Sequence, residues 1–208
     1  MKKIKKIINK KNKTKIVCLT AYSKNIAEIV DDHADIVLVG DSLGSVLYNY
    51  NTTRKVTLNM MIEHTKSARM GVKKCLLVID LPYNTYRNKS EALKNSKKAI
   101  KETKCDAVKV EGGTKVKEIV KHLVKNRIPV LGHIGITPQT TKGKFISKGK
   151  NEAEKRKLFK DAKDLEQSGA FGIVLECIYS DVSKKITNLI NIPTIGIGAS
   201  VNCDGQVL

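Results

Sequence analysis

The chain has 208 residues, a hydrophobic content of 41% and a formal net charge of +19. This length suits one domain with a sizeable core. No apolar run approaches the roughly 20 residues that span a bilayer, and residues 1–10 lack the apolar segment and cleavage site of a signal peptide. We therefore expect a cytoplasmic protein with no membrane partner.

The basic charge does not by itself indicate a nucleic-acid partner. The lysines are spread along helix-like segments, aromatic residues make up only 4% of the chain, and tryptophan is absent. Stacking platforms for single strands are therefore scarce. We expect no nucleic-acid partner, and we interpret the lysines as solvated helix faces or as an attraction for small anionic substrates.

The cysteines are scattered, odd in number and never spaced as Cys-x-x-Cys. They are Cys18, Cys75, Cys105, Cys177 and Cys203. Most lie in or beside apolar runs, where a free cysteine behaves as a small hydrophobic residue. We expect buried thiols and neither disulfides nor zinc ligands.

Strands and helices are predicted to alternate along the chain. The first strand covers 15–22, and Ser23 is the expected N-cap of a helix over 24–32. A second strand, 36–40, ends at a glycine and opens into a polar loop at Asp41 and Ser42. The later elements are helix 58–70, strand 75–80, helix 90–103, strand 107–111, helix 115–125, strand 128–133, helix 152–167, strand 172–176, helix 182–189 and strand 192–197.

These units favour a single α/β domain over residues 1–208. Near-continuous apolar strands that alternate with amphipathic helices are typical of a parallel sheet covered by helices. An open doubly wound sheet is the alternative, but no Gly-x-Gly-x-x-Gly follows the first strand. Polar residues instead gather at the ends of successive strands, where (β/α)₈ barrels build their active sites. They are Asp41, Asp80, Lys109, Glu111, His133 and Glu176. We predict a (β/α)₈ TIM barrel whose eighth unit is missing.

Three of these polar residues form a candidate Mg²⁺ site. Asp41 and Asp80 follow neighbouring strands, and Glu111 ends the next one. Mg²⁺ takes oxygen ligands and keeps positions for water and substrate, so two or three carboxylates suffice. The alternative is that each aspartate only caps the turn that follows it.

The other polar residues suggest charge stabilisation and proton transfer. Lys109 lies two residues before Glu111, so both face the same side of their strand, and a buried lysine needs an anion, from a substrate or from a neighbouring acid. His133 lies among glycines and could bind a substrate oxygen or be structural. Glu176 follows an apolar run, so we interpret it as a partly desolvated base or as a buried acid paired with Lys109, and both can be true because an ion-paired acid can still take a proton.

Blocks of sequence spread from Ile16 to Leu208 resemble the ketopantoate hydroxymethyltransferase family. They are Leu19-Thr-Ala-Tyr, Val39-Gly-Asp-Ser-Leu-Gly, Val56-Thr-Leu, Asp80-Leu-Pro, Val108-Lys-Val-Glu-Gly-Gly, Gly132-His-Ile-Gly-Ile-Thr-Pro-Gln, Val174-Leu-Glu-Cys, Gly196-Ile-Gly-Ala and Asp204-Gly-Gln-Val-Leu. So many blocks in one order are far more specific than any single motif.

The resemblance implies a Mg²⁺-dependent (β/α)₈ enzyme of the phosphoenolpyruvate mutase/isocitrate lyase type. Such an enzyme transfers a one-carbon unit from 5,10-methylenetetrahydrofolate to 3-methyl-2-oxobutanoate through an enolate, which gives 2-dehydropantoate. The implied roles are metal binding by Asp41, Asp80 and Glu111, substrate binding by Asp41, Ser42, Asp80, Lys109 and His133, and catalysis by Glu176 as base. The family is cytoplasmic and forms homo-oligomers, commonly decamers.

The chain departs from the family pattern in several places. Ser23 and Glu63 replace an acid and a tyrosine, and the loop 141–149 lacks a glycine pair, which affects the expected folate contacts. Family members also continue for another unit beyond Leu208. We therefore expect open edges on the first and seventh strands, and a chain that is not a complete active enzyme by itself.

Two other functions are compatible with these residues. A carbon–carbon lyase of the same superfamily would share the metal site and would need no folate. A truncated, inactive homologue, or one associated with nucleic acid, would show no turnover.

Overall fold

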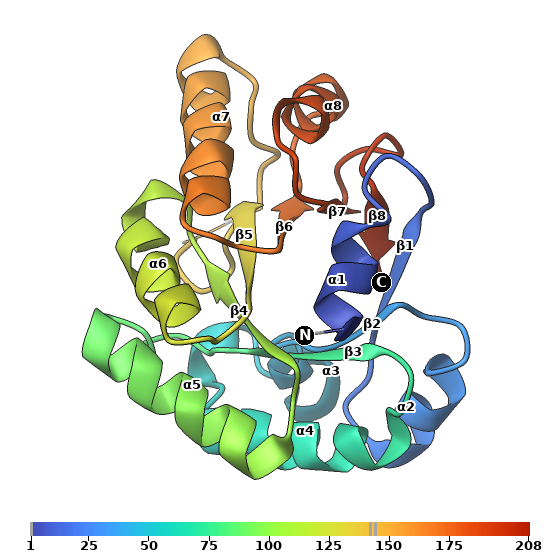
Figure 1. Cartoon of the computed structure of the whole chain (residues 1–208). Helices are drawn as coiled ribbons and strands as arrows, with labels where there is room; N and C mark the ends of the chain where they lie inside the picture. Colours follow the sequence, from blue (N-terminus) through green and yellow to red (C-terminus); the bar gives the residue numbers. More distant parts are fainter. Residues whose placement is uncertain (1, 142, 144) are drawn as a thin grey trace.

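Eight parallel strands close into a barrel, and helices pack around its outside (Figure 1). The computed structural model describes residues 2–141, 143 and 145–208. Each strand pairs with the next one along the chain, and the last strand pairs with the first. The predicted TIM barrel is confirmed.

The strands are β1 (Ile16–Thr20), β2 (Ile36–Val39), β3 (Leu76–Asp80), β4 (Ala107–Glu111), β5 (Val130–Gly135), β6 (Gly172–Glu176), β7 (Thr194–Ile197) and β8 (Gly205–Val207). The helices are α1 (Lys2–Ile8), α2 (Lys24–Val30), α3 (Leu43–Tyr48), α4 (Leu58–Gly71), α5 (Lys89–Thr103), α6 (Lys117–Lys125), α7 (Glu152–Gln167) and α8 (Ser180–Leu189), with short 3₁₀ turns η1 (Thr53–Lys55) and η2 (Thr114–Val116). No described helix is both long and apolar enough to cross a membrane.

Alternate side chains of each strand point into the barrel, as the pleat requires. One cluster fills the interior, with Leu76 and Val78 from β3 and Ala107 from β4 among its members. Their odd-numbered neighbours on the other face, Leu77 and Ile79 on β3, pack against the surrounding helices. This alternation continues to the carboxyl ends of the strands, so Asp80 and Lys109 also belong to the inward-facing series.

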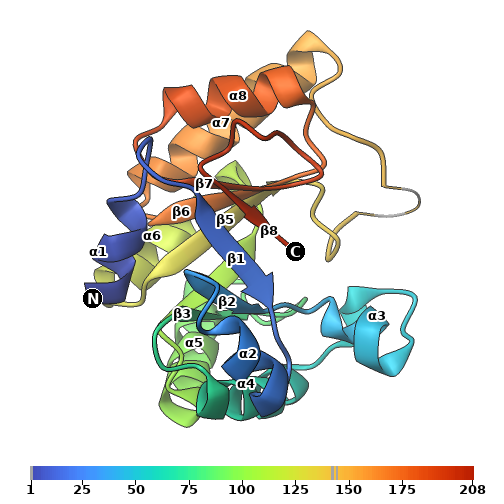
Figure 2. The same cartoon turned by 90° about the vertical axis from the view of Figure 1, so that its right-hand side faces the viewer.

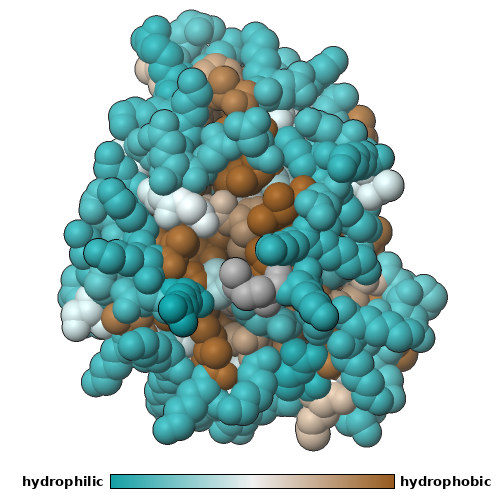
Figure 3. Space-filling model, in the orientation of Figure 1, coloured by the Kyte–Doolittle hydropathy of each residue, from teal (hydrophilic) through white to brown (hydrophobic). Residues whose placement is uncertain are grey.

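Helix α1 covers the end of the barrel at which the strands begin. Ile4 and Ile7 are buried in the same cluster as the interior strand residues. Figure 2 shows α1 on one side of the barrel, and α3 on the opposite side, toward which the arrowheads of β1 and β8 point. On the face that carries α1, hydrophilic side chains surround a few apolar ones near the middle (Figure 3). The carboxyl ends of the strands are thus left as the open mouth.

The predicted open edges are wrong, because β8 is present and closes the barrel. Ile16 and Val17 of β1 lie in register with Gly205 and Gln206, and β8 also pairs with β7. A Cβ on Gly205 would lie 2.4 Å from the carbonyl oxygen of Ile16, so only glycine allows this approach. With three residues, β8 is too short to give a strand pattern in the sequence.

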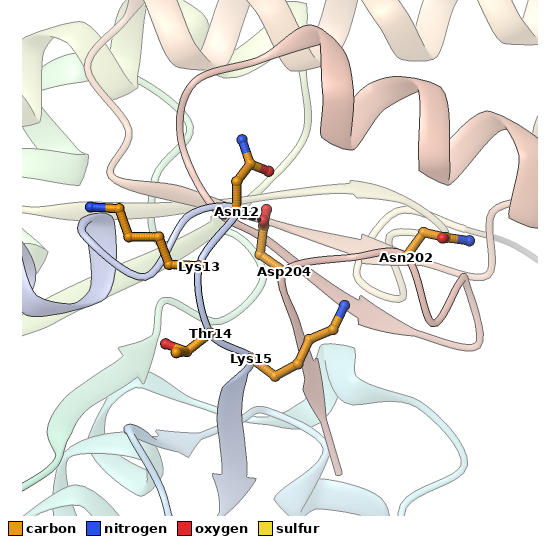
Figure 4. Close-up of a pocket in the computed structure, with 6 residues that line it drawn as sticks. All are labelled: Asn12, Lys13, Thr14, Lys15, Asn202 and Asp204. Atoms are coloured by element: carbon orange, nitrogen blue, oxygen red, sulfur yellow. Dashed lines mark hydrogen bonds between the residues drawn. The ribbon is translucent and has the colours of Figure 1, made fainter.

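Asp204 anchors this closure at the amino ends of the strands. Its carboxylate accepts hydrogen bonds from Lys11 Nζ at 2.8 Å, the Thr194 amide at 2.9 Å and the Asn12 amide at 3.1 Å. Figure 4 shows Asp204 and Asn12 beside a small cavity of about 230 Å³. Burial would raise the pKa of Asp204, but Lys11 and the two amides outweigh it, and the pKa is lowered.

We expect Asp204→Asn to lower the melting temperature at pH 7 by about 5–10 °C, because it leaves the buried Lys11 ammonium without its counter-charge, a loss of roughly 3 kcal/mol. A lowered carboxyl pKa stabilises the fold above the ordinary aspartate value of about 3.9 and stops doing so as the pH falls below it. The melting temperatures of both proteins should therefore converge toward pH 3.

The control Asp32→Asn breaks an exposed pair with Lys74 and should change stability by less than about 1 kcal/mol. Equal melting temperatures of the wild type and Asp204→Asn at pH 7 would remove Asp204 from this role.

The other differences from the prediction are local. The fifth and seventh strands begin two residues later than expected, after Pro129 and Pro193, which have no amide hydrogen to donate. Ser23 does occupy the N-cap position of α2, but its side chain makes no capping hydrogen bond. Helices α1 and α3 were not predicted, and α3 lies in the stretch expected to be a loop.

Candidate active site

A buried ion pair lies at the centre of the barrel mouth. Asp80 and Lys109 are opposite each other on β3 and β4. Lys109 Nζ lies 2.7 Å and 2.8 Å from the two carboxylate oxygens of Asp80. Burial would lower the pKa of Lys109, but the carboxylates of Asp80, Glu111 and Asp41 outweigh burial and raise it. Lys109 is therefore a permanent cation among acids.

Asp41 and Glu111 are two further buried acids at the mouth. Burial raises the pKa of Asp41 to about 7, helped by the charge of Asp80 and opposed by Lys109. Burial likewise raises the pKa of Glu111 to about 8, opposed by Lys109 and helped by Asp41. Several carboxylates thus share one ammonium group, and near neutral pH part of this cluster carries protons.

Gln139, in the loop after β5, connects these two acids, and the sequence interpretation did not single it out. Its side-chain amide donates to Asp41 Oδ2 at 2.8 Å, and its backbone amide donates to Glu111 Oε2 at 3.1 Å. Tyr86 Oη donates to its side-chain oxygen at 2.6 Å, and Arg54 Nε donates to its carbonyl at 2.9 Å. Gln139 belongs to one of the matched sequence blocks, which was the only signal for it.

The three predicted metal ligands do not form a ready-made metal shell. Among the described residues, no group of three or more histidine, cysteine, aspartate or glutamate side chains converges closely enough to hold an ion. The Asp80 carboxylate is already paired with the Lys109 ammonium group, and Gln139 donates hydrogen bonds to both Asp41 and Glu111. The donor chemistry nevertheless fits Mg²⁺. All three side chains offer carboxylate oxygens, and a bound cation would relieve the repulsion between their negative charges.

His133 and Glu176 form the other half of the mouth, on β5 and β6. Glu176 Oε2 lies 3.1 Å from His133 Nε2, and Glu111 Oε1 lies 3.6 Å from His133 Nδ1. Neither ring nitrogen makes a hydrogen bond of acceptable geometry, although the ring is fully buried. Burial, and then Lys109, lower the pKa of His133, so the ring is neutral. Unpaired buried nitrogens of this kind are suited to a ligand.

Glu176 is the most accessible acid of the cluster. Its side chain is 19% exposed, whereas the side chains of Asp80 and Glu111 are each 2% exposed. The alternative interpretation, a buried acid paired with Lys109, is wrong, because Lys109 pairs with Asp80. Gly135 allows β5 to approach Glu176 closely, since a Cβ there would lie 2.1 Å from the Glu176 carbonyl oxygen.

Ser42 lies at the rim, at the start of α3. Its hydroxyl is 2.9 Å from Tyr22 Oη, and the Asp41 amide beside it donates to Asp80 Oδ2 at 3.3 Å. The predicted site residues therefore share one mouth, with Ser42 at its edge. In the loop 141–149, residues 142 and 144 lie outside the described part of the chain, and Arg54 donates to the Thr141 carbonyl at 3.3 Å.

This arrangement suits the removal of a proton next to a carbonyl group. Lys109 supplies a fixed positive charge where negative charge would develop. Glu176 is an accessible carboxylate at the opposite side, and the neutral His133 lies between it and Glu111. A small anionic ligand would find both a cation and a base within one mouth.

Comparisons with known proteins match the chain to one family. The model of the family described as ketopantoate hydroxymethyltransferase matches residues 1–208. The 3-methyl-2-oxobutanoate hydroxymethyltransferase of Pelagibacter ubique is 64% identical over 207 residues, covering 100% of this chain and 80% of the relative. The protein of the same name from Rhizobium etli is 48% identical over 196 residues, covering 93% and 72%.

Solved structures share the fold at low sequence identity. A 2,3-dimethylmalate lyase of the PEP mutase/isocitrate lyase superfamily aligns with a TM-score of 0.72 and 12% identity, covering 100% of this chain and 77% of that one. A phosphonopyruvate hydrolase in complex with oxalate and Mg²⁺ aligns with a TM-score of 0.68 and 10% identity, covering 95% and 72%. These likenesses show that the chain shares the barrel fold of these proteins.

Proposed function

The chain belongs to the ketopantoate hydroxymethyltransferase family, and from that premise we propose that it transfers a hydroxymethyl group from 5,10-methylenetetrahydrofolate to 3-methyl-2-oxobutanoate. The products are 2-dehydropantoate and tetrahydrofolate, and one water is consumed to supply the hydroxyl oxygen. The observation that carries the proposal is the buried cluster at the mouth, in which one lysine, several carboxylates and a histidine without a well-formed hydrogen bond lie next to one another.

The oxo acid binds at the carboxylate and ammonium cluster. Lys109 attracts its negative charge and later stabilises the charge that develops on the carbonyl oxygen. Ser42 and the one N–H of the neutral His133 ring are hydrogen-bond donors for its oxygens. Gln139 and Lys109 hold the surrounding acids in place before the substrate arrives.

Asp41, Asp80 and Glu111 would hold Mg²⁺. When bound, the ion polarises the oxo acid and makes the proton at C3 easier to remove. Its binding requires that Asp41 and Glu111 lose their protons and that the Gln139 amide gives up Asp41.

Glu176 takes the proton from C3. It is the accessible carboxylate, and His133 contacts it from the interior side. The electron pair of the broken C–H bond forms the enolate. Water releases the methylene carbon of the donor as formaldehyde: both carbon–nitrogen bonds break, and the two hydrogens of the water pass to the two nitrogens. C3 of the enolate then bonds to this carbon, and its oxygen takes the proton back from Glu176 to become the hydroxyl group. Lys109 stays charged through these steps, because its pKa is raised.

This proposal predicts isotope exchange without the folate. The protein with Mg²⁺ and 3-methyl-2-oxobutanoate in D₂O should replace the C3 hydrogen by deuterium, measured by proton NMR. At subsaturating Mg²⁺ the rate should rise with pH as Asp41 passes about 7 and Glu111 passes about 8, because raised pKa values keep the ligands protonated at lower pH.

A chelator should abolish the exchange, and the oxo acid should be recovered intact. Cleavage of the oxo acid in the absence of folate would instead indicate the lyase alternative. An exchange rate that is independent of Mg²⁺ would remove the metal from the proposal.

We also propose that the chain acts in the cytoplasm as a homo-oligomer, as the family resemblance implies. Large apolar side chains are exposed on two helices at one side of the barrel. They are Ile26 and Ile29 of α2 and Val46 and Leu47 of α3, each at least half exposed. Surfaces of this kind are suited to contact with another copy of the chain.

A further inference from the structure

A second cavity adjoins the mouth and is not needed for the oxo acid. Its volume is about 480 Å³, within the range of small-molecule sites. Glu111 and Gln139 line it on the side of the mouth, and Gly112, Gly113 and Ile134 are further parts of its wall. A ligand in this cavity would reach the mouth at the Glu111 and Gln139 wall.

The inner wall of the cavity is aromatic and apolar. Tyr83 and Tyr86, from the loop after β3, line it together with Val116 and Ile134. Tyr86 is held in place, because its hydroxyl donates to Gln139 and accepts from the Glu111 amide at 3.3 Å. Arg54 lies over the Tyr83 ring, 5.4 Å from its centroid. Such walls favour a flat ring system.

The outer rim of the cavity is basic. Arg87, Lys115, and Lys157 and Lys160 of α7 are among its lining residues. Lys157 and Lys160 each pair with an aspartate of α7, and Arg87 pairs with Glu91. Lys115 is exposed at the rim and has no salt bridge among the described residues. An anionic extension of a bound ring system would lie among these cations.

We propose that this cavity binds the one-carbon donor, with the ring portion of a reduced folate against Tyr83 and Tyr86 and its glutamyl tail along Lys115 and Lys157. The assignment rests on the proposed function, which requires such a donor beside the oxo acid. The ring portion lies toward Glu111 and Gln139, where the two substrates meet. Each added glutamate brings another carboxylate to the basic rim, so longer tails bind more tightly and this gain weakens with salt.

The test measures tetrahydrofolate binding by calorimetry, with the monoglutamate and the triglutamate as separate ligands. Lys115→Glu should weaken binding of the triglutamate by about 5-fold and of the monoglutamate by about 2-fold. Tyr83→Leu should weaken both by roughly 5- to 10-fold through loss of the aromatic contact. Lys121→Glu is the matched control, because this exposed lysine of α6 makes the same charge change and does not line the cavity.

Each outcome decides the assignment. Weakened binding in both cavity variants, with the control like the wild type, supports it. Wild-type binding in Lys115→Glu and Tyr83→Leu would overturn it, as would a wild type that binds no tetrahydrofolate. Deuterium exchange at C3 needs no folate donor. If the wild type shows this exchange while Lys115→Glu and Tyr83→Leu bind tetrahydrofolate like the wild type, only the assignment of folate to this cavity is refuted. Absence of that exchange in the wild type would instead refute the proposed function.

Discussion

Glu176→Gln is expected to suppress deuterium exchange at C3 of 3-methyl-2-oxobutanoate by 10²-fold or more, the scale of a positioned general base. The amide is nearly the same size as the carboxylate, and it cannot accept a proton at neutral pH. Because the Glu176 side chain is partly exposed and its contact with His133 is not a good hydrogen bond, the fold should tolerate the change. Proton NMR measures the exchange, and circular dichroism checks the fold.

The matched control is Glu154→Gln on α7. Glu154 accepts hydrogen bonds from the Gly149 and Lys150 amides and forms no hydrogen bond or ion pair with the described mouth residues, so its replacement should leave the exchange near the wild-type rate. Exchange by Glu176→Gln at the wild-type rate would transfer the role of base to another group, of which His133 is the nearest.

Lys109→Met is expected to lower the melting temperature by about 10 °C in the absence of Mg²⁺. The variant removes the Lys109 ammonium that Asp80 contacts and leaves a buried carboxylate without this counter-charge, a loss of roughly 3–5 kcal/mol. The methionine fills a similar volume, so the effect reports charge and not a cavity. Turnover with Mg²⁺ present should fall as well, because Lys109 no longer stabilises the charge that develops on the carbonyl oxygen.

Two further measurements test whether the loss of stability comes from the missing positive charge beside Asp80. Mg²⁺ should raise the melting temperature of Lys109→Met by more than that of the wild type, because the ion replaces the missing charge among the carboxylates. The double variant Asp80→Asn/Lys109→Met should lose less stability than the two single variants together, since the partners are in contact. Additive losses would show that Asp80 and Lys109 do not depend on each other.

The inward-facing half of the site could be predicted because strands have a period of two. That period places Lys109 and Glu111 on one face of β4, and the strand order places Asp80 opposite Lys109. The partner of Glu176 could not be predicted in this way. Lys109 on β4 and Glu176 on β6 are separated by β5, and the side chain that fills the space between them is His133.

The site residue and the strand that the sequence did not predict, Gln139 and β8, lie where the sequence has little strand or helix periodicity. Gln139 lies in a loop, where neither a strand nor a helix period fixes its direction, yet it connects Asp41 with Glu111. Strand β8 has three residues, and its pairing depends on the close approach of Gly205 to β1. Helix α1 did carry a signal, since Ile4 and Ile7 are three residues apart and both are buried.

The most direct measurement follows the transferred carbon itself. The purified protein is incubated with Mg²⁺, 3-methyl-2-oxobutanoate and 5,10-methylenetetrahydrofolate carrying ¹³C at the methylene carbon, and the products are analysed by ¹³C NMR. The label should leave the donor and appear as a hydroxymethyl carbon bonded to a quaternary C3, in step with the formation of tetrahydrofolate. A label that stays in the donor while C3 still exchanges with D₂O, or an oxo acid that is cleaved, would contradict hydroxymethyl transfer.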